Sequence, residues 1–311
     1  MEGALSVALY DVVIIGAGPA GMTAAIYAAR ANMSVLLLEK LAPGGQIINT
    51  HEIQNYTGVG TINGAELAYK MFEHTQELQV AFDYGTVKDI KEEGNIKIIT
   101  CEEEEKIFEA KTVILATGTI PRRLGVENED RFAGENISWC AICDGAYYRD
   151  KDVVVIGGGN SAVEEAIYLA SLANSVKVVT LFDLTADPVS CDELRALPNV
   201  TIYEFYNIEG FTGVEKLQGV RIKSTQTQEE VELTCDGVFE YIGLKPSTEA
   251  FAALGILDEQ GYIKVNSRME TSVAGIYGAG DVVTKELRQV VTACSDGAVA
   301  AQVASKYIKT I

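Results

Sequence analysis

The chain has 311 residues, 48% of them hydrophobic, and this length suits two domains of moderate size. Its formal net charge of -19 argues against nucleic acid as a partner, because no basic stripe can displace counterions from phosphates. No apolar run of about 18 residues occurs, so a membrane span is not expected. The N-terminal stretch lacks a basic start, and the six cysteines include one closely spaced pair, which favours a cytoplasmic protein over a disulfide-rich secreted one.

The first dinucleotide-binding pattern lies near the N-terminus. A β-branched run at 10–15 leads into the glycine turn at 16–21, and a helical pattern follows from Met22 to about Ala31. A second apolar run at 35–38 ends at Glu39. Such glycines permit a tight turn and the close approach of a pyrophosphate to the helix N-terminus, and the acid binds ribose hydroxyls. The order of these parts predicts a dinucleotide-binding fold.

The segment between this unit and the paired cysteines contains simpler patterns. An amphipathic helix is expected over 66–78, and short alternating runs at 80–101 predict a small antiparallel sheet. The acidic tip at 102–105 is interpreted as a solvated turn rather than a metal site. A buried strand at 111–118 ends in a glycine turn and returns the chain to the first sheet.

The paired cysteines lie in the segment Trp139-Cys140-Ala141-Ile142-Cys143-Asp144-Gly145. Two cysteines separated by two residues can close a disulfide and exchange two electrons with another disulfide. The carboxyl group of Asp144 follows directly, where it can deliver a proton to a departing thiolate. The other cysteines, at 101, 191, 235 and 294, are expected to be small core residues. The segment therefore indicates a redox enzyme.

A second copy of the strand–turn–helix pattern follows the cysteines. A strand at 151–156 precedes the turn Gly157–Ala162, a helix is expected from Val163 to about Leu172, and a strand from Val176 to Phe182. The position that corresponds to Glu39 is Thr180, so no acid is present to bind a ribose. The sequence predicts a second dinucleotide-type fold, and it leaves open whether any nucleotide still binds there.

The C-terminal part contains a strand at 235–243, a linker at Lys245-Pro246 and the segment 275–282. In the last of these, a strand ending in Gly280-Asp281 can direct one carboxylate at a ribityl or ribose hydroxyl, although a plain strand–turn–helix is the alternative. A long helix is expected from Val290 to Tyr307.

Motifs along nearly the whole chain resemble those of the low-molecular-weight thioredoxin reductases. The middle of the chain holds the CxxCD segment, whereas glutathione-reductase-like enzymes have theirs near the N-terminus. The matching motifs are GAGPAG at 16–21, GGQ at 44–46, ATG at 116–118, WCAICDG at 139–145, GGGNSAVEEA at 157–166, GAGDV at 278–282 and RQ at 288–289.

This resemblance implies an α/β fold with two Rossmann-like dinucleotide-binding domains of the three-layer ββα type, the second inserted in the first. The FAD-binding domain is expected at 1–118 and 246–311, and the redox-active CxxC domain at 119–245. Cys143 is expected to face the flavin, Cys140 to exchange with thioredoxin, and Asp144 to act as the acid. The family also implies a homodimer and a large relative motion of the domains. The expected FAD contacts are Gly16, Gly18, Pro19, Ala20, Gly21, Glu39, Gly45, Gln46, Asn55, Ala116, Thr117, Gly118, Gly280, Asp281, Arg288 and Gln289.

The chain departs from the family where NADPH-dependent members carry an HRRxxxR motif. The corresponding positions hold Thr180, Leu181, Phe182 and Ala186, and Asp183 adds a negative charge. Each lost guanidinium–phosphate bond is worth roughly 1.5–3 kcal/mol, so NADPH affinity is expected to be lost.

Three hypotheses follow from this departure. The favoured one is a reductase most like the ferredoxin-dependent flavin thioredoxin reductases, with reduced ferredoxin as donor. An acidic ferredoxin would need a local basic patch on this acidic chain, from Arg122, Arg123, Arg131 or Arg149. The alternatives are an NADPH- or NADH-dependent thioredoxin reductase with altered nucleotide recognition, and a flavin-bearing sensor with a regulatory dithiol.

Overall fold

The computed structural model describes residues 8–49, 53, 55–103, 106–139 and 141–311, with the backbone only for Asn49, Ile142 and Cys143. The chain divides into two compact units, of which the first comprises residues 1–120 and 245–311 and the second residues 121–244. The second unit is thus an insertion in the first. The chain leaves the first unit within strand β7 (Thr119–Pro121) and returns within strand β16 (Leu244–Pro246), and these two strands pair.

The first unit is built on a seven-stranded sheet with the order β3-β2-β1-β6-β5-β4, and β17 also pairs with β6. Strands β1, β2, β3, β6 and β17 are parallel, whereas β4 and β5 form an antiparallel extension. The strands are β1 (Leu9–Ile15), β2 (Val35–Glu39), β3 (Ala81–Tyr84), β4 (Val87–Glu93), β5 (Ile96–Cys101), β6 (Ile107–Leu115) and β17 (Ile276–Gly278).

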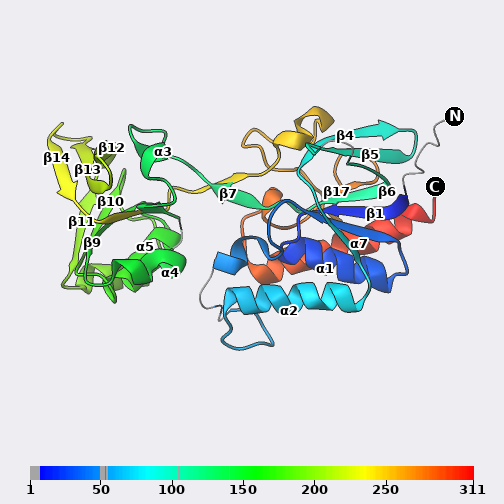
Figure 1. Ribbon diagram of the computed structural model, residues 1–311, viewed down its shortest axis with the longest axis horizontal. Helices are drawn as coiled ribbons and strands as arrows, with labels where there is room; N and C mark the ends of the chain where they lie inside the picture. Colours follow the sequence, from blue (N-terminus) through cyan, green and yellow to red (C-terminus); the bar gives the residue numbers. More distant parts are fainter. Residues whose placement is uncertain (1–7, 50–52, 54, 104–105, 140) are drawn as a thin grey trace. The chain divides into compact units, whose positions relative to one another are not determined.

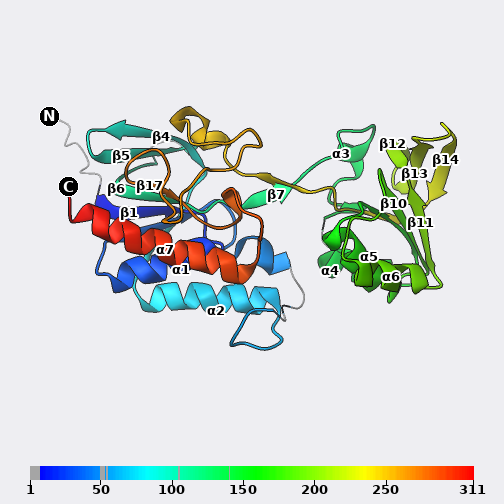
Figure 2. The same cartoon turned by 180° about the vertical axis from the view of Figure 1, so that it is seen from behind.

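Helices cover one face of this sheet. Figures 1 and 2 show α1 and α7 side by side along the parallel strands, with α2 next to α1. Alanines and Gly297 on the facing sides let α1 and α7 approach closely; a Cβ on Gly297 would lie 2.1 Å from the Ala20 carbonyl oxygen. The helices are α1 (Pro19–Arg30), α2 (Gly64–Glu77) and α7 (Val290–Ile308), with short 3-10 turns η1 (Gly45–Asn49), η3 (Glu249–Leu254) and η4 (Gly280–Val282).

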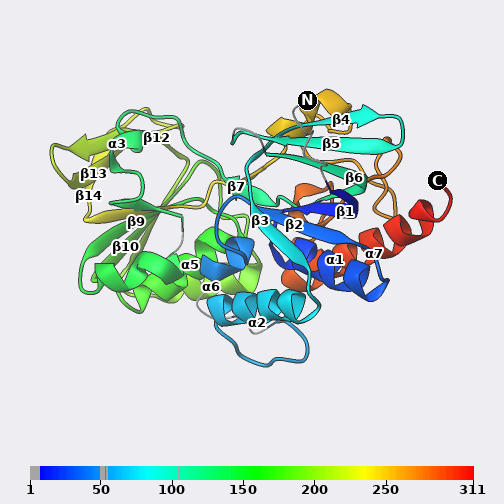
Figure 3. The same ribbon diagram turned by 45° about the vertical axis from the view of Figure 1, so that its right-hand side comes forward.

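The second unit has three layers. A five-stranded parallel sheet with the order β11-β10-β9-β15-β8 lies between helices and a three-stranded antiparallel sheet, β12-β13-β14. Figure 3 shows α5 and α6 on one side of β9 and β10. The strands are β8 (Ile137–Ser138), β9 (Asp152–Ile156), β10 (Ser175–Thr180), β11 (Val200–Glu204), β12 (Tyr206–Gly213), β13 (Leu217–Ser224), β14 (Glu230–Thr234) and β15 (Gly237–Glu240). The helices are α3 (Glu129–Phe132), α4 (Ala141–Asp144), α5 (Asn160–Ala170) and α6 (Pro188–Ala196), with the 3-10 turn η2 (Gly145–Tyr148).

The expected α/β class, with one Rossmann-like unit inserted in another, is confirmed. Two local expectations were wrong. The strand expected to reach Phe182 ends at Thr180, because the chain then turns back towards the glycine turn and leaves Leu181 44% and Phe182 64% exposed. The small antiparallel sheet expected over 80–101 is not separate, because β3 pairs in parallel with β2 and only β4 and β5 are antiparallel, within the same seven-stranded sheet. Helix α6 was missed from the sequence.

The four cysteines outside the CxxC segment are free thiols. Cys101, Cys191 and Cys235 are buried, which confirms the prediction of core residues, whereas Cys294 is half-buried. Burial raises the pKa of Cys101 to about 11 and that of Cys235 to about 12, so these thiols stay protonated and unreactive at neutral pH. Within the described part of the chain, no helix has the length and apolar character needed to cross a membrane.

Candidate functional site

The glycine turn at the start of α1 combines tight packing with one open position. Gly16 has φ +104°, and a Cβ there would lie 2.3 Å from the Ala116 carbonyl oxygen. A Cβ on Gly21 would lie 1.8 Å from the Gly16 carbonyl oxygen, so α1 packs directly on the turn. By contrast, a Cβ on Gly18 would meet only the Cα of Gly45, 4.0 Å away. These two facing glycines leave room for a pyrophosphate at the positive end of α1, whose first turn carries no acidic residue.

Glu39 lies against the same turn. Its Oε2 accepts a hydrogen bond of 2.7 Å from the Ala17 amide, and its Oε1 accepts one of 2.9 Å from the Leu41 amide. These bonds fix the carboxylate at the end of β2, and each oxygen keeps a second lone pair for a ribose hydroxyl. The geometry fits the role expected for this residue in dinucleotide binding.

Gln46 connects η1 with the start of β7. Its Nε2 donates to the carbonyl oxygen of Thr119 at 2.8 Å and to the Thr119 hydroxyl at 2.7 Å. The neighbouring Thr117 donates through its hydroxyl to the Ser247 carbonyl oxygen at 2.6 Å, and Gly118 has φ +65°. The sequence pointed to Gln46 and to residues 116–118 separately, and the structure brings them together through Thr119.

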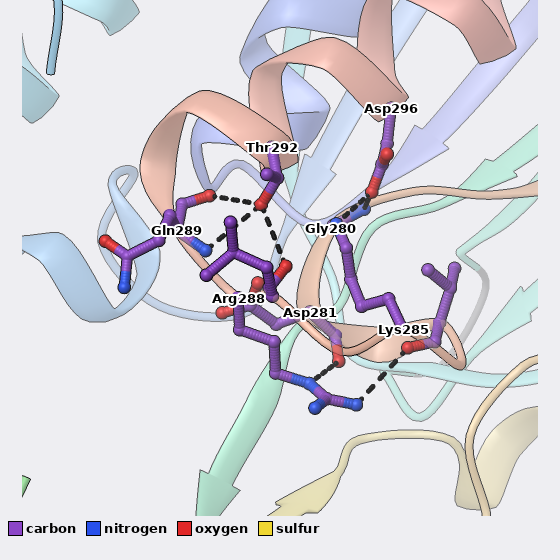
Figure 4. A network of polar contacts seen from close by, with 9 residues as sticks. Gly280, Asp281, Lys285, Arg288, Gln289, Thr292 and Asp296 are labelled. Atoms are coloured by element: carbon purple, nitrogen blue, oxygen red, sulfur yellow. Dashed lines mark hydrogen bonds and ion pairs between the residues drawn. The ribbon is translucent and has the colours of Figure 1, made fainter. Parts of the chain in front are cut away.

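The segment after β17 is held by a network of polar contacts (Figure 4). The Gly280 amide donates to Oδ2 of Asp296 at 3.0 Å, and Asp296 also pairs with Lys285. Arg288 donates through Nε to the Asp281 carbonyl oxygen at 3.2 Å, and its guanidinium lies 4.4 Å from the Tyr262 ring centroid. These contacts hold the backbone of 280–281 in place without using the Asp281 side chain.

The Asp281 side chain has an unused acceptor. Its Oδ1 is buried and has no hydrogen-bond partner among the described residues. Burial raises the pKa of Asp281, while the positive charges of Lys285 and Arg288 act in the opposite direction. A buried carboxyl oxygen without a donor costs about 1–3 kcal/mol, so its presence indicates a ligand that supplies a donor. A ribityl or ribose hydroxyl has the required chemistry, and the arrangement fits FAD.

Asn55 and Gln289 lie far apart in the sequence and meet in the structure. Asn55 donates through Nδ2 to Oε1 of Gln289 at 2.9 Å. Gln289 is the N-cap of α7 and forms a capping box with Thr292. Both residues are therefore placed at a second helix N-terminus of the same unit, as a shared ligand would require.

Some residues of this site were not found from the sequence. Lys285 and Asp296 have side chains only 14% and 12% exposed, yet nothing local marks them as a pair. Asp296 lies seven residues after Gln289 on the face of α7 that packs inward, and a carboxylate on an apolar helix face is a signal that could have pointed to it. Tyr56 and Cys294 form a further contact: the tyrosine hydroxyl lies 3.7 Å from Sγ, which is 3.8 Å from the Pro19 carbonyl oxygen.

Replacing Asp296 by alanine is expected to lower the free energy of unfolding by about 3–5 kcal/mol, because the buried Lys285 charge loses its partner. The Gly280 amide also loses its acceptor. Thermal and urea unfolding of the variant would measure the loss. Exchange of the exposed Glu286 for glutamine is the control, and an Asp296→Ala protein as stable as this control would contradict the assignment.

The dithiol segment lies in the second unit. Cys140 falls outside the described residues, and Cys143 belongs to α4, with only its backbone described. Asp144 ends this helix, and its Oδ2 accepts a hydrogen bond of 2.5 Å from the Ser138 hydroxyl. The Ala141 amide donates to the Tyr241 hydroxyl at 2.7 Å, and burial raises the pKa of that hydroxyl. Tyr241, which follows β15, therefore anchors the backbone at Ala141. Ser138 of β8 anchors the carboxyl group of Asp144.

The second glycine turn is partly covered by the chain that follows β10. The Thr185 amide donates to the Gly158 carbonyl oxygen at 2.7 Å, and the Asp187 amide donates to Oδ1 of Asn160 at 2.7 Å. A Cβ on Gly158 would lie 2.5 Å from the Thr180 hydroxyl. The nearest arginine along the chain, Arg195, pairs with Glu204 at 2.8 Å. No guanidinium in this stretch is left to hold a 2′-phosphate.

Known proteins resemble this chain along almost its entire length. A thioredoxin reductase of Bacillus subtilis is 43% identical over 310 residues, which cover 97% of this chain and 96% of the relative. The crystal structure of Lactococcus lactis thioredoxin reductase is 42% identical with a TM-score of 0.91, covering 97% of this chain and 100% of that one. The likeness confirms the α/β fold with two Rossmann-like domains.

A ferredoxin-flavin thioredoxin reductase of Clostridium acetobutylicum is less similar. It is 31% identical with a TM-score of 0.54, over 97% of this chain and 99% of that one. Overall similarity therefore does not support the expectation that the chain is most like the ferredoxin-dependent enzymes. That expectation was based on the unusual residues at 180–186.

The sequence profile of the pyridine nucleotide-disulphide oxidoreductase family matches residues 10–297. This match spans the glycine turn of α1, the CxxCD segment and the Asp281 network. The chain therefore belongs to the pyridine nucleotide-disulphide oxidoreductase family and is a flavoprotein oxidoreductase with FAD as its cofactor.

Proposed function

We propose that the chain is a thioredoxin reductase whose Cys140/Cys143 dithiol reduces the disulfide of thioredoxin. The observation on which this proposal depends is the CxxCD segment, whose residues 141–144 form α4, with the carboxyl group of Asp144 held by Ser138. The relatives named thioredoxin reductase, at 42–43% identity over nearly the full length, support the same substrate. When bound, FAD supplies the electron pair that opens the Cys140–Cys143 disulfide.

The first unit is proposed to hold FAD, within the expected domain 1–118 and 246–311. Gly18 and Gly45 would accommodate the pyrophosphate at the N-terminus of α1, Glu39 would bind ribose hydroxyls, and Asp281 would accept from the ribityl chain. The remaining expected contacts extend this site in the same unit, namely Gly16, Pro19, Ala20, Gly21, Gln46, Asn55, Ala116, Thr117, Gly118, Gly280, Arg288 and Gln289.

The second unit, with the expected boundaries 119–245, would perform the disulfide exchange. The Cys140 thiolate attacks one sulfur of the thioredoxin disulfide, forms a mixed disulfide and releases the other sulfur as a thiolate. Asp144 is the acid that protonates this thiolate, and the Ser138 hydroxyl orients the carboxyl group of Asp144. Cys143 then attacks the sulfur of Cys140, which closes the Cys140–Cys143 disulfide and releases reduced thioredoxin.

We propose reduced ferredoxin rather than NADPH as the electron donor. The proposal is based on the stretch 180–187, which lacks the arginines of NADPH-dependent members and carries Asp183 and Asp187 instead. Arg123 lies over the Trp139 ring at 4.0 Å, and Arg122 donates to the Leu244 carbonyl oxygen at 2.9 Å, so both belong to contacts within their own unit. An acidic ferredoxin would have to use their exposed edges together with the exposed Arg149.

NADH is the second candidate donor, because the glycine turn before α5 is retained. A Cβ on Gly159 would meet only the Thr185 hydroxyl, 4.0 Å away, which leaves space beside the N-terminus of α5. NADH has no 2′-phosphate and does not need the missing arginines.

Anaerobic mixing of the oxidised holoenzyme with each donor is expected to bleach the flavin rapidly with reduced ferredoxin and only slowly with micromolar NADPH. Dithionite serves as the control that the flavin can be reduced. Rapid bleaching by NADPH would contradict the donor proposal, and rapid bleaching by NADH alone would favour the second candidate. If the reduced flavin never passed electrons to thioredoxin, a sensor with a regulatory dithiol would be the better description.

We also propose a homodimer, on the grounds of the family resemblance. The cysteine pattern favours a location in the cytoplasm. Light scattering from the intact holoenzyme would test the dimer, and a monomeric mass would contradict it.

A further inference from the structure

A buried pair of carboxyl groups lies beside the residue that precedes the redox dithiol. Glu129 begins α3 and Glu240 ends β15, and each is only 2% exposed. Two glutamates removed from water in this way cannot both be charged without a large cost in free energy. Neither residue belongs to the FAD site or to the CxxCD segment.

Two backbone amides and an arginine surround the carboxyl group of Glu129. Its two oxygens accept from the Leu124 amide at 3.1 Å and from the Gly125 amide at 2.5 Å. The Arg123 guanidinium lies 3.8 Å from its Oε1. These donors hold the Glu129 side chain in place.

Glu240 has the environment of a protonated acid. Its Oε2 accepts from Nε1 of Trp139 at 3.0 Å, whereas its Oε1 receives no donor among the described residues. Burial, and next the negative charge of Glu129, raise the pKa of Glu240 to about 8, while Trp139 and Arg123 act in the opposite direction. Protonation of Glu240 removes the repulsion between the two buried carboxyl groups and turns Glu240 into a possible donor.

The indole ring of Trp139 is thereby held on two sides. Its N–H donates to Glu240, and the Arg123 guanidinium lies over its face, 4.0 Å from the ring centroid. The next residue in the chain is Cys140. If Glu240 loses its proton, two carboxylates repel each other. Glu129 is fixed by two backbone amides, so Glu240 is the side chain that moves, and Trp139 loses its partner.

We propose that Glu240 is a positioning residue for the dithiol: through its hydrogen bond to Trp139 it holds the backbone before Cys140 in place for disulfide exchange. The inference depends on the proposed function of Cys140 and Cys143. Loss of the Glu240 proton beside the buried Glu129 makes this positioning sensitive to alkaline pH.

The fluorescence of Trp139 provides a direct measurement, because it is the chain's single tryptophan. In the holoenzyme, its emission is expected to change with a midpoint near pH 8, the value to which the pKa of Glu240 is raised. Glu240→Gln keeps an acceptor for the indole and a donor for Glu129 but cannot titrate, so the transition should disappear. Glu193→Gln, an exposed change in the same unit, is the matched control and should retain it.

The kinetic consequence is measured in single turnovers with photoreduced holoenzyme and oxidised thioredoxin. Glu240→Gln should match the wild-type rate at pH 7, and Glu240→Leu, which removes the acceptor, should be about 10-fold slower. The ratio of the wild-type rate to the Glu240→Gln rate should fall as the pH rises through 8, since thiol titration is common to both proteins.

Two results would overturn the inference: an alkaline fluorescence transition that persists in Glu240→Gln, or a Glu240→Leu protein that retains the wild-type rate. The fluorescence titration needs no turnover, so it tests the acidic pair even if the proposed function is wrong. A Cys143→Ser protein that still reduces thioredoxin would instead refute the proposed function and leave the fluorescence result unaffected.

Discussion

Replacing Cys143 by serine is expected to abolish disulfide reduction while FAD remains bound at its normal stoichiometry. A serine hydroxyl cannot form a disulfide with Cys140, so the rate should fall by at least about 10³-fold. FAD binding should be unaffected, because the proposed FAD residues all belong to the first unit and Cys143 to the second. Flavin absorbance after gel filtration measures binding, and thioredoxin-dependent reduction of insulin measures turnover.

The control for this experiment is Cys101→Ala. This thiol is buried in β5 of the first unit and has no part in the proposed exchange, so turnover should persist. If Cys143→Ser retained turnover while Cys101→Ala lost it, the assignment of the dithiol would be refuted.

Replacing Asp281 by alanine is expected to weaken FAD binding by about 10- to 100-fold. The estimate corresponds to the loss of one hydrogen bond to a charged group, about 1.5–3 kcal/mol. The protein without FAD should respond differently, because the substitution removes a buried carboxyl oxygen that has no donor of its own. The apoprotein should therefore be as stable as the wild type or more stable, whereas the holoprotein should be less stable.

The contribution of Asp281 to the stability of the apoprotein is expected to decrease as the pH rises. Burial raises the pKa of Asp281 in the folded state, so the folded protein retains this proton at pH values where the unfolded chain has lost it. The contribution of Asp281 to stability is fully present below the unfolded pKa and is lost as the pH rises through the folded pKa. Asp281→Asn should remove this contribution to the pH dependence of the free energy of unfolding.

Isothermal titration with FAD and thermal unfolding, each with and without FAD, measure these effects. Glu286→Gln is the matched control, since it is an exposed acidic residue in the same segment. Unchanged FAD affinity in Asp281→Ala would mean that another residue accepts the ribityl hydroxyl and that the buried oxygen has a different purpose.

The second glycine turn shows where reasoning from sequence reached its limit. Residues 151–182 were expected to form a Rossmann unit without its ribose-binding acid, and the observed strand, turn, helix and strand over 152–180 have that form. The spacing of the glycines did not reveal that the chain after β10 forms hydrogen bonds with Gly158 and Asn160. Those bonds join residues about 27 positions apart, and their formation depends on how the loop packs rather than on any local preference.

The acidic pair is a second example of a feature without a local signal. Glu129 and Glu240 are 111 positions apart, and each is an ordinary charged residue by composition. Their burial follows from the pairing of β15 with β8 and β9, which places the end of β15 next to Trp139 and α3.

The sequence by itself predicted the two Rossmann-like units, their order along the chain and the closely spaced cysteine pair, whereas most of the proposed FAD residues followed from the family resemblance. The two units were found through glycine spacing, apolar periodicity and the position of Glu39 at a strand end, all of which are local. Only the tertiary structure decided which polar groups are buried and with what partners: the free oxygen of Asp281, the Lys285–Asp296 pair and the two buried carboxyl groups of Glu129 and Glu240. Burial and hydrogen bonding between distant segments arise from packing, and packing depends on the whole chain at once.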